Sequence, residues 1–144
     1  MLTALLFLLM LPTPQLAGEK GRTTLRGNLG VSGGASVLEG EGKRVPLTSR
    51  DKNIAASLGD SRLAGRELHI VGQFGPDGAF DVAELHVVRR AALYRLIYFC
   101  DVCNITTFSP GDCACCQQPL QPIEVLPTDP RVYQEQLGAP SEKP

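Results

Sequence analysis

All five cysteines of this chain lie within seventeen consecutive residues. Two of them, Cys100 and Cys103, form a Cys-x-x-Cys hook, and Cys113 and Cys116 repeat this spacing after nine intervening residues. A Cys-x-x-Cys turn directs its two sulfurs toward one point, and two such turns facing each other form a tetrahedron of four thiolates. The spacing therefore predicts a metal site with these four ligands. Zn2+ is preferred over iron because it is the more general occupant of such sites.

Cys115 is the surplus sulfur. Side chains of adjacent residues diverge, so we expect Cys115 outside the ligand set, as a free thiol, a dimer-linking cysteine or an alternative ligand in place of Cys116. Asn104 follows the first hook, where a left-handed residue is often needed and asparagine tolerates that conformation. Residues 109–112 supply the turn that returns the chain to the second hook.

Four thiolates around a divalent ion carry a net charge of −2. Backbone N–H groups, together with nearby Arg89, Arg90 or Arg95, are expected to offset this charge.

Disulfides are the main alternative to a metal, because an exported protein meets an oxidising compartment. Five cysteines leave one unpaired, and pairing within each hook gives small strained rings of the redox-active type. Pairing between the hooks and thiol redox chemistry both stay open at this point.

No catalytic constellation is visible, which predicts a protein without enzymatic activity. Residues 27–33 are rich in glycine but lack the Lys-Ser/Thr ending of a phosphate-binding loop. Asn104 follows Cys103 where covalent haem attachment needs histidine. His69 and His86 are interpreted as half-exposed strand residues. They would form a second metal site only if both faced the same side of adjacent strands, and nothing in the sequence determines that register.

Composition limits the partners. The 144 residues carry a formal net charge of −1 without a strong block of either sign. Nucleic-acid binding and anionic membranes both favour a basic stripe, so neither is expected as a partner. The length suits one compact domain with irregular ends.

Residues 1–17 contain no charged side chain and resemble a signal peptide, although no Lys or Arg stands near their start. Their apolar run, residues 2–11, is too short to span a bilayer comfortably. We therefore expect an exported protein, periplasmic or extracellular, with no membrane attachment after signal removal. Residues 128–144 are predicted to be a disordered proline-rich tail.

Short apolar runs separated by glycines predict an all-β domain with few helices. Residues 51–65 break the alternation and favour a short helix that Asp51 caps. Glycine-rich turns are expected at residues 30–34 and 40–42, and the Val82 to Leu85 spacing predicts a bulge near Ala83 or Glu84. The predicted strands are residues 23–29, 35–39, 44–48, 66–74, 79–89 and 93–99, with a further short strand within residues 123–126.

Three strands, a helical link and two more strands is the order of a five-stranded OB barrel. We expect an OB-like β domain over residues 18–90, with an open β-sandwich as the alternative. Residues 91–127 would form a strand and a zinc-ribbon-like hairpin that carries the cysteines.

Two stretches, Tyr-Phe-Cys-Asp-Val-Cys at residues 98–103 and Pro-Gly-Asp-Cys-Ala-Cys-Cys-Gln at residues 110–117, resemble the ending of a group of small exported bacterial proteins with an OB-like domain. The resemblance covers residues 23–118, and its cysteine motif is the specific part. It implies a fold and a site but no activity. The hairpin is also similar to zinc-ribbon and rubredoxin-like knuckles, from which it departs by lacking a glycine after each hook and by adding Cys115.

We therefore expect an exported, non-catalytic protein that binds structural zinc and acts as an interaction or metal-handling module. A rubredoxin-like iron or dithiol electron-transfer protein is the first alternative, and a disulfide-stapled binding module is the second. The chain would be a monomer or a dimer linked through Cys115, with an unknown protein partner.

Overall fold

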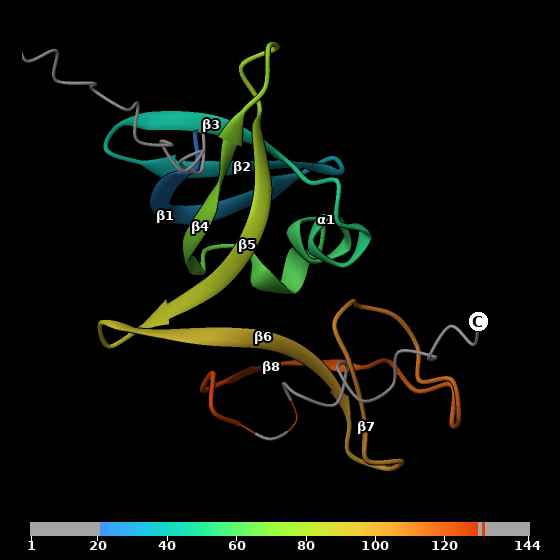
Figure 1. The fold of residues 1–144 in the computed structure, drawn as a ribbon. Helices are drawn as coiled ribbons and strands as arrows, with labels where there is room; N and C mark the ends of the chain where they lie inside the picture. The colour runs from blue at the N-terminus through green and yellow to red at the C-terminus, as the bar shows by residue number, and fades with distance from the viewer. Residues whose placement is uncertain (1–20, 130, 132–144) are drawn as a thin grey trace, which may run out of the picture.

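The computed structural model describes residues 21–129 and 131, and these residues are mostly β-strand (Figure 1). The expectation of an all-β protein with few helices is confirmed. The strands are β1 (Thr23–Ser32), β2 (Ala35–Gly40), β3 (Lys43–Thr48), β4 (Glu67–Phe74), β5 (Phe80–Arg89), β6 (Ala92–Cys100), β7 (Ile105–Thr107) and β8 (Gln121–Val125). The predicted signal peptide and most of the predicted tail lie outside the described residues.

The first five strands are joined by pairings that follow a cycle. Strand β1 pairs antiparallel with both β2 and β4, β2 pairs with β3, and β4 pairs with β5. A short parallel contact between β3 and β5, at Leu47↔Phe80 and Thr48↔Asp81, completes the cycle. The order of strands along the cycle is therefore 1-2-3-5-4, and at these two residue pairs the edges of β3 and β5 are paired with each other.

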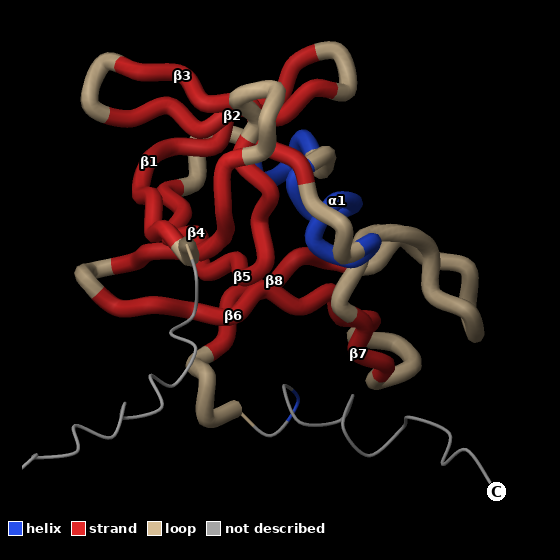
Figure 2. The backbone as a smooth tube through the Cα atoms, turned by 45° about the horizontal axis from the view of Figure 1, so that its top comes forward, coloured by secondary structure: helices blue, strands red, loops and turns tan. Residues whose placement is uncertain are grey.

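The link between β3 and β4 is helical, as predicted. It consists of α1 (Lys52–Leu58) and the 3-10 turn η1 (Ser61–Leu63). The carboxylate of Asp51 accepts from the backbone N–H groups of Asn53 and Ile54, which confirms it as the N-cap of α1. Figure 2 shows this helical segment, in blue, between the N-terminal strands and the loops that follow β6.

Hairpin turns of two residues join three pairs of strands. Gly33 and Gly34 have φ of 57° and 81°, so β1 continues to Ser32 and the turn is shorter than the expected 30–34. In the β5–β6 hairpin the left-handed positions are occupied by Arg90 and Ala91, with φ of 47° and 62°. Consecutive positive φ values match the right-handed twist of the flanking strands, and this twist allows such tight turns.

The predicted bulge lies at Ala83. Val71 pairs with Glu84 while the next residue, Gly72, pairs with Val82, so Ala83 is the extra residue on β5. At Gly72 the backbone of β5 approaches so closely that an added Cβ would lie 2.0 Å from the carbonyl oxygen of Asp81. Glycine is therefore required at this position by packing against the bulged strand.

One hydrophobic core serves both halves of the protein. Leucine, isoleucine and phenylalanine side chains from the N-terminal strands, among them Leu68, Ile70 and Phe80, belong to the same buried cluster as Tyr98 of β6 and Leu120, which follows the cysteines. The core thus extends across residue 90, the expected boundary between the β domain and the hairpin.

Strand β6 leaves the N-terminal strands and forms a second sheet with β7 and β8, seen in the lower part of Figure 1. Glu124 of β8 connects this sheet to the N-terminal part of the chain. Its side chain is only 6% exposed and forms ion pairs with Arg66 and Arg89 at 2.5 and 3.1 Å. Arg62 adds a second link: its guanidinium donates to the carbonyl oxygen of Leu120 at 2.8 Å and lies over the ring of Tyr98.

Tyr98 should make the fold less stable at alkaline pH. Its side chain is fully buried, and burial raises the pKa of its phenol above the usual value of 10. A group whose pKa is higher in the folded state contributes its full stabilisation below its unfolded pKa and loses it as pH rises further. We expect the midpoint of urea unfolding to fall as the pH rises above 10, with no such loss near pH 7.

Tyr98→Phe tests this assignment. Because the Tyr98 hydroxyl makes no well-formed hydrogen bond, the variant should stay within about 1 kcal/mol of the parent at pH 7. The loss of stability above pH 10 should become smaller, and an unchanged alkaline profile would contradict the role of Tyr98.

Among residues 21–129 and 131, no helix has the length and apolar character needed to cross a bilayer.

Candidate metal centre

The four cysteines predicted as ligands come together in the structure. The sulfurs of Cys100, Cys103, Cys113 and Cys116 all lie within 4.8 Å of one another, and the Cys100 and Cys116 sulfurs are 3.5 Å apart. A tetrahedral ion with sulfur ligands at about 2.3 Å separates those sulfurs by roughly 3.8 Å. The group can therefore hold one metal ion with small side-chain adjustments.

The first hook is the turn between β6 and β7. Strand β6 ends at Cys100, and the backbone N–H of Cys103 donates to the Cys100 sulfur at 3.5 Å. Asn104 then adopts φ of 54°, the left-handed conformation expected from the sequence. This residue turns the chain away from the sulfurs and into β7, which pairs back onto β6.

The second hook has the same construction. Backbone N–H groups of Cys116 and Cys115 hydrogen-bond to the Cys113 sulfur, and they lower the pKa of that thiol to about 7. Gln117 has φ of 62°, and its N–H donates to the Cys113 carbonyl at 2.9 Å. The Cys113 N–H donates to the carbonyl of Gln118 at 2.8 Å, which closes the turn.

Gln117 was missed by the sequence analysis. It occupies the position after the second hook that Asn104 occupies after the first, and both have positive φ. Glutamine carries no local signal for a left-handed conformation, whereas asparagine does. Equivalence of the two hooks was the only clue that could have indicated it.

The four sulfurs differ in their exposure to solvent. Cys100 and Cys113, the first residue of each hook, are 3% and 1% exposed and belong to the hydrophobic core. Cys103 and Cys116, the last residues, are half-buried. One side of the site therefore faces the protein interior, and the other side is accessible from the surface.

Cys115 is exposed and stands outside the group of four. Its thiol nevertheless interacts with that of Cys103, and this contact is the largest of the causes that raise the pKa of Cys103. All five cysteines are free thiols in the structure. The role of Cys115 as a spare thiol or alternative ligand stays a prediction.

The arginines expected to offset the charge of the site lie elsewhere. Arg89 and Arg90 precede β6, whereas Cys100 ends it, and Arg89 is paired with Glu124. Arg95 stands opposite Val125 in β8, near the middle of β6. Backbone N–H groups of the two hooks are the donors that the structure places on the sulfurs.

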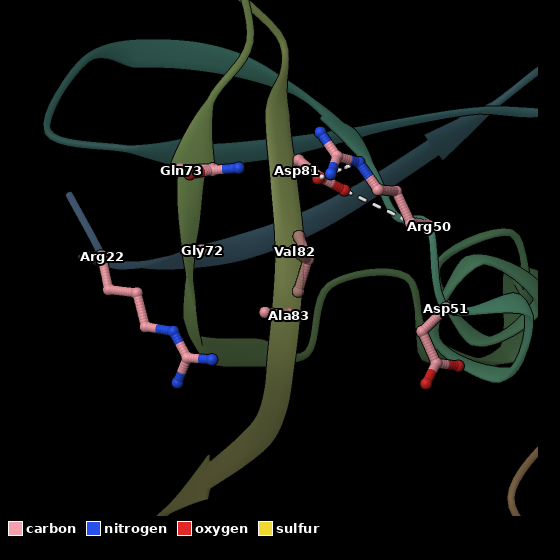
Figure 3. Close-up of a pocket in the computed structure, with 8 residues that line it drawn as sticks. All are labelled: Arg22, Arg50, Asp51, Gly72, Gln73, Asp81, Val82 and Ala83. Atoms are coloured by element: carbon pink, nitrogen blue, oxygen red, sulfur yellow. Dashed lines mark hydrogen bonds and ion pairs between the residues drawn. The ribbon is translucent and has the colours of Figure 1, made fainter. Parts of the chain in front are cut away.

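A cleft of about 510 Å³ crosses β4 and β5 beside the bulge (Figure 3). Two of its charged groups pair with each other, since the Nε of Arg50 lies 3.0 Å from the Oδ2 of Asp81. Asp51 at its rim caps α1. No cysteine, histidine or serine is among the described residues that line it.

Gln117→Gly should stabilise the second hook. A residue other than glycine in the left-handed conformation costs about 1–2 kcal/mol, which glycine avoids. We expect a gain of about 1 kcal/mol in urea unfolding with the four cysteines undisturbed. Gln118→Gly is the matched control, because Gln118 does not have positive φ. Equal gains in both variants would contradict the backbone explanation.

Comparison of the chain with protein-family models, with curated proteins and with solved structures finds no significant match.

Proposed function

We propose that this chain is an exported, non-catalytic β protein whose four-cysteine hairpin holds one structural Zn2+. The observation that carries this proposal is the convergence of four sulfurs within 4.8 Å on two hooks of equivalent backbone geometry. Two disulfides would need the sulfurs to approach in pairs, with no reason for all four to meet at one point. A single tetrahedral ion needs this arrangement.

The cycle of strand pairings supports an OB-like barrel for residues 23–89. Strands follow the order 1-2-3-5-4, with the helical link between β3 and β4. A parallel contact between β3 and β5 is the pairing that an open sandwich would not need. On this proposal the barrel is the support, and β6 carries the metal hairpin outward from it.

A structural role for the metal follows from the burial of its ligands. Cys100 and Cys113 pack in the core that also contains Tyr98 and Leu120. Without an ion, like-charged thiolates or unpaired thiols would have to share that space. A bound ion would hold the hairpin and the adjoining core in one arrangement, so metal binding and folding would be coupled.

The hairpin also offers an interaction surface. Val102 lies inside the first hook and is 73% exposed, more than any other large hydrophobic residue in the described part of the chain. A metal beneath the hook would present this side chain on a rigid turn. We propose that the rigid turn contacts a protein partner, or that the exposed side of the site exchanges metal.

Elemental analysis of protein purified from its native compartment tests the metal. One zinc per chain in a colourless protein is the expected result. A red protein with charge-transfer absorption would identify iron and a rubredoxin-like role instead. No stoichiometric metal, together with a single titratable thiol, would contradict both metal assignments and favour disulfides. Recovery of the protein from the cytoplasm with residues 1–17 still attached would contradict export.

A further inference from the structure

The two histidines of the chain stand directly opposite each other. His69 of β4 pairs with His86 of β5 in the register of the antiparallel sheet. Leu68 and Ile70, which flank His69 in β4, point into the core and are fully buried, so His69 lies on the opposite, outer face of the sheet. Side chains directly opposed on neighbouring strands have Cβ atoms about 5 Å apart. The condition that the sequence left undetermined, one shared side of adjacent strands, is therefore met.

The two imidazole rings are spaced for a shared ion. Their centroids lie 6.3 Å apart with an interplanar angle of 63°. Imidazole nitrogens bind divalent transition metals at about 2.1 Å, so two rings on one ion have centroids roughly 4.5 Å apart at a right angle at the metal, about 5.3 Å at a tetrahedral angle and about 6.5 Å in a linear arrangement. The observed separation lies at the wide end of this range, so the two rings would move about 1 Å closer to share a tetrahedral ion.

Within residues 21–129 and 131, the imidazole nitrogens of both histidines have no hydrogen-bond partner. No hydrogen bond joins either imidazole to another described residue, and the Nδ1 of His86 is buried without a partner. A buried polar atom without a hydrogen bond is costly, which gives the pair a reason to accept a ligand. Neutral imidazole is also the most common protein ligand of copper, nickel and zinc ions.

The strands that carry the histidines are rigidly placed. Strand β4 lies between β1 and β5 and is hydrogen-bonded along both of its edges. Two carboxylates lie on the same face, each two residues before a histidine: Glu67, which pairs with Arg26 at 2.6 Å, and Glu84, which pairs with Arg22 at 3.2 Å. Arg95 is the cation that acts on His86.

We propose that His69 and His86 form a second metal site, on the outer face of β4 and β5, that takes a divalent ion of the copper, nickel and zinc kind with water completing its coordination. This site is separate from the cysteine hairpin and does not depend on the function proposed for it. A bound ion would join β4 to β5 and stabilise the folded chain by mass action.

Ni2+ is the probe, added to the full chain as purified, with Cys115→Ser to remove the exposed thiol. Calorimetry should show one Ni2+ per chain, with the metal content of the purified protein unchanged by elemental analysis. Because the chain has two histidines in all, both imidazole signals in the NMR spectrum should broaden beyond detection. Absence of Ni2+ binding, or broadening of one signal alone, would overturn the shared site.

Substitutions identify the ligands. His69→Gln and His86→Gln should each weaken Ni2+ binding at least tenfold, since one imidazole alone holds the ion poorly. Arg95→Gln is the matched variant, and it should strengthen binding several-fold because a neighbouring cation is removed. Unchanged affinity in either histidine variant, or weaker binding in Arg95→Gln, would place the ion elsewhere.

Discussion

Cys113→Ser is expected to reduce the metal content from one ion per chain to none and to lower the melting temperature substantially. Cys113 is 1% exposed, and its sulfur accepts hydrogen bonds from backbone N–H groups of the second hook, which lower its pKa to about 7. It is therefore the sulfur most readily present as a thiolate at neutral pH. Serine supplies a poor metal ligand in its place, and the core around it loses the ion that holds both hooks.

The measurement is elemental analysis combined with thermal unfolding. Because metal binding contributes directly to folding in sites of this kind, we expect a fall in melting temperature on the order of 10 °C or more. Cys100→Ser should behave in the same way, since Cys100 is equally buried. A chelator added to the parent protein should reproduce the loss without any substitution.

Cys115→Ser is the control, and it should keep the metal and the melting temperature of the parent. Cys115 is exposed and lies outside the group of four. Equal loss of metal in Cys115→Ser would contradict the ligand assignment. Full retention of the metal in Cys113→Ser would also contradict the ligand assignment. The ion would then be held without Cys113, with Cys115 in its place.

Gly72→Ala is expected to destabilise the protein by about 3 kcal/mol, the upper part of the range for overpacked cores. An added Cβ would lie 2.0 Å from the Asp81 carbonyl oxygen and 2.9 Å from the Cε1 of Phe80. Both strands would have to separate at the bulge, because a backbone carbonyl cannot turn aside as a flexible side chain can. Urea unfolding would show the loss as a lower midpoint.

Gly59→Ala is the matched control for this prediction. Gly59 ends α1 with φ of −82°, and the nearest atom to an added Cβ is the Ala56 carbonyl oxygen at 3.6 Å. The added methyl group therefore meets ordinary contacts, and stability should change by no more than about 0.5 kcal/mol. Comparable losses in the two variants would show that close approach at the bulge is not the cause.

Local features of the structure were predictable where one segment carried the whole signal. Asp51 was predicted to cap α1 because an N-cap needs only a carboxylate and the next turn of helix. The bulge at Ala83 was predictable because the Val82 to Leu85 spacing breaks the alternation of the strand itself. The turn before Ala35 was predicted to begin at Gly30, but it begins at Gly33, because β1 continues through Gly30 to Ser32. Glycine carries the same local turn signal at both positions, so the sequence could not distinguish them.

The amino-acid sequence by itself determined the composition of the candidate metal centre, because each Cys-x-x-Cys hook is a local turn whose spacing brings its own sulfurs together. Tertiary structure alone decided how the two hooks meet, with Cys100 and Cys113 buried in the core and Cys103 and Cys116 half-buried at its edge. It also decided that His69 faces His86 and that β3 reaches β5, since strand register and sheet closure depend on contacts between distant residues. Such contacts leave no periodic mark in either segment alone.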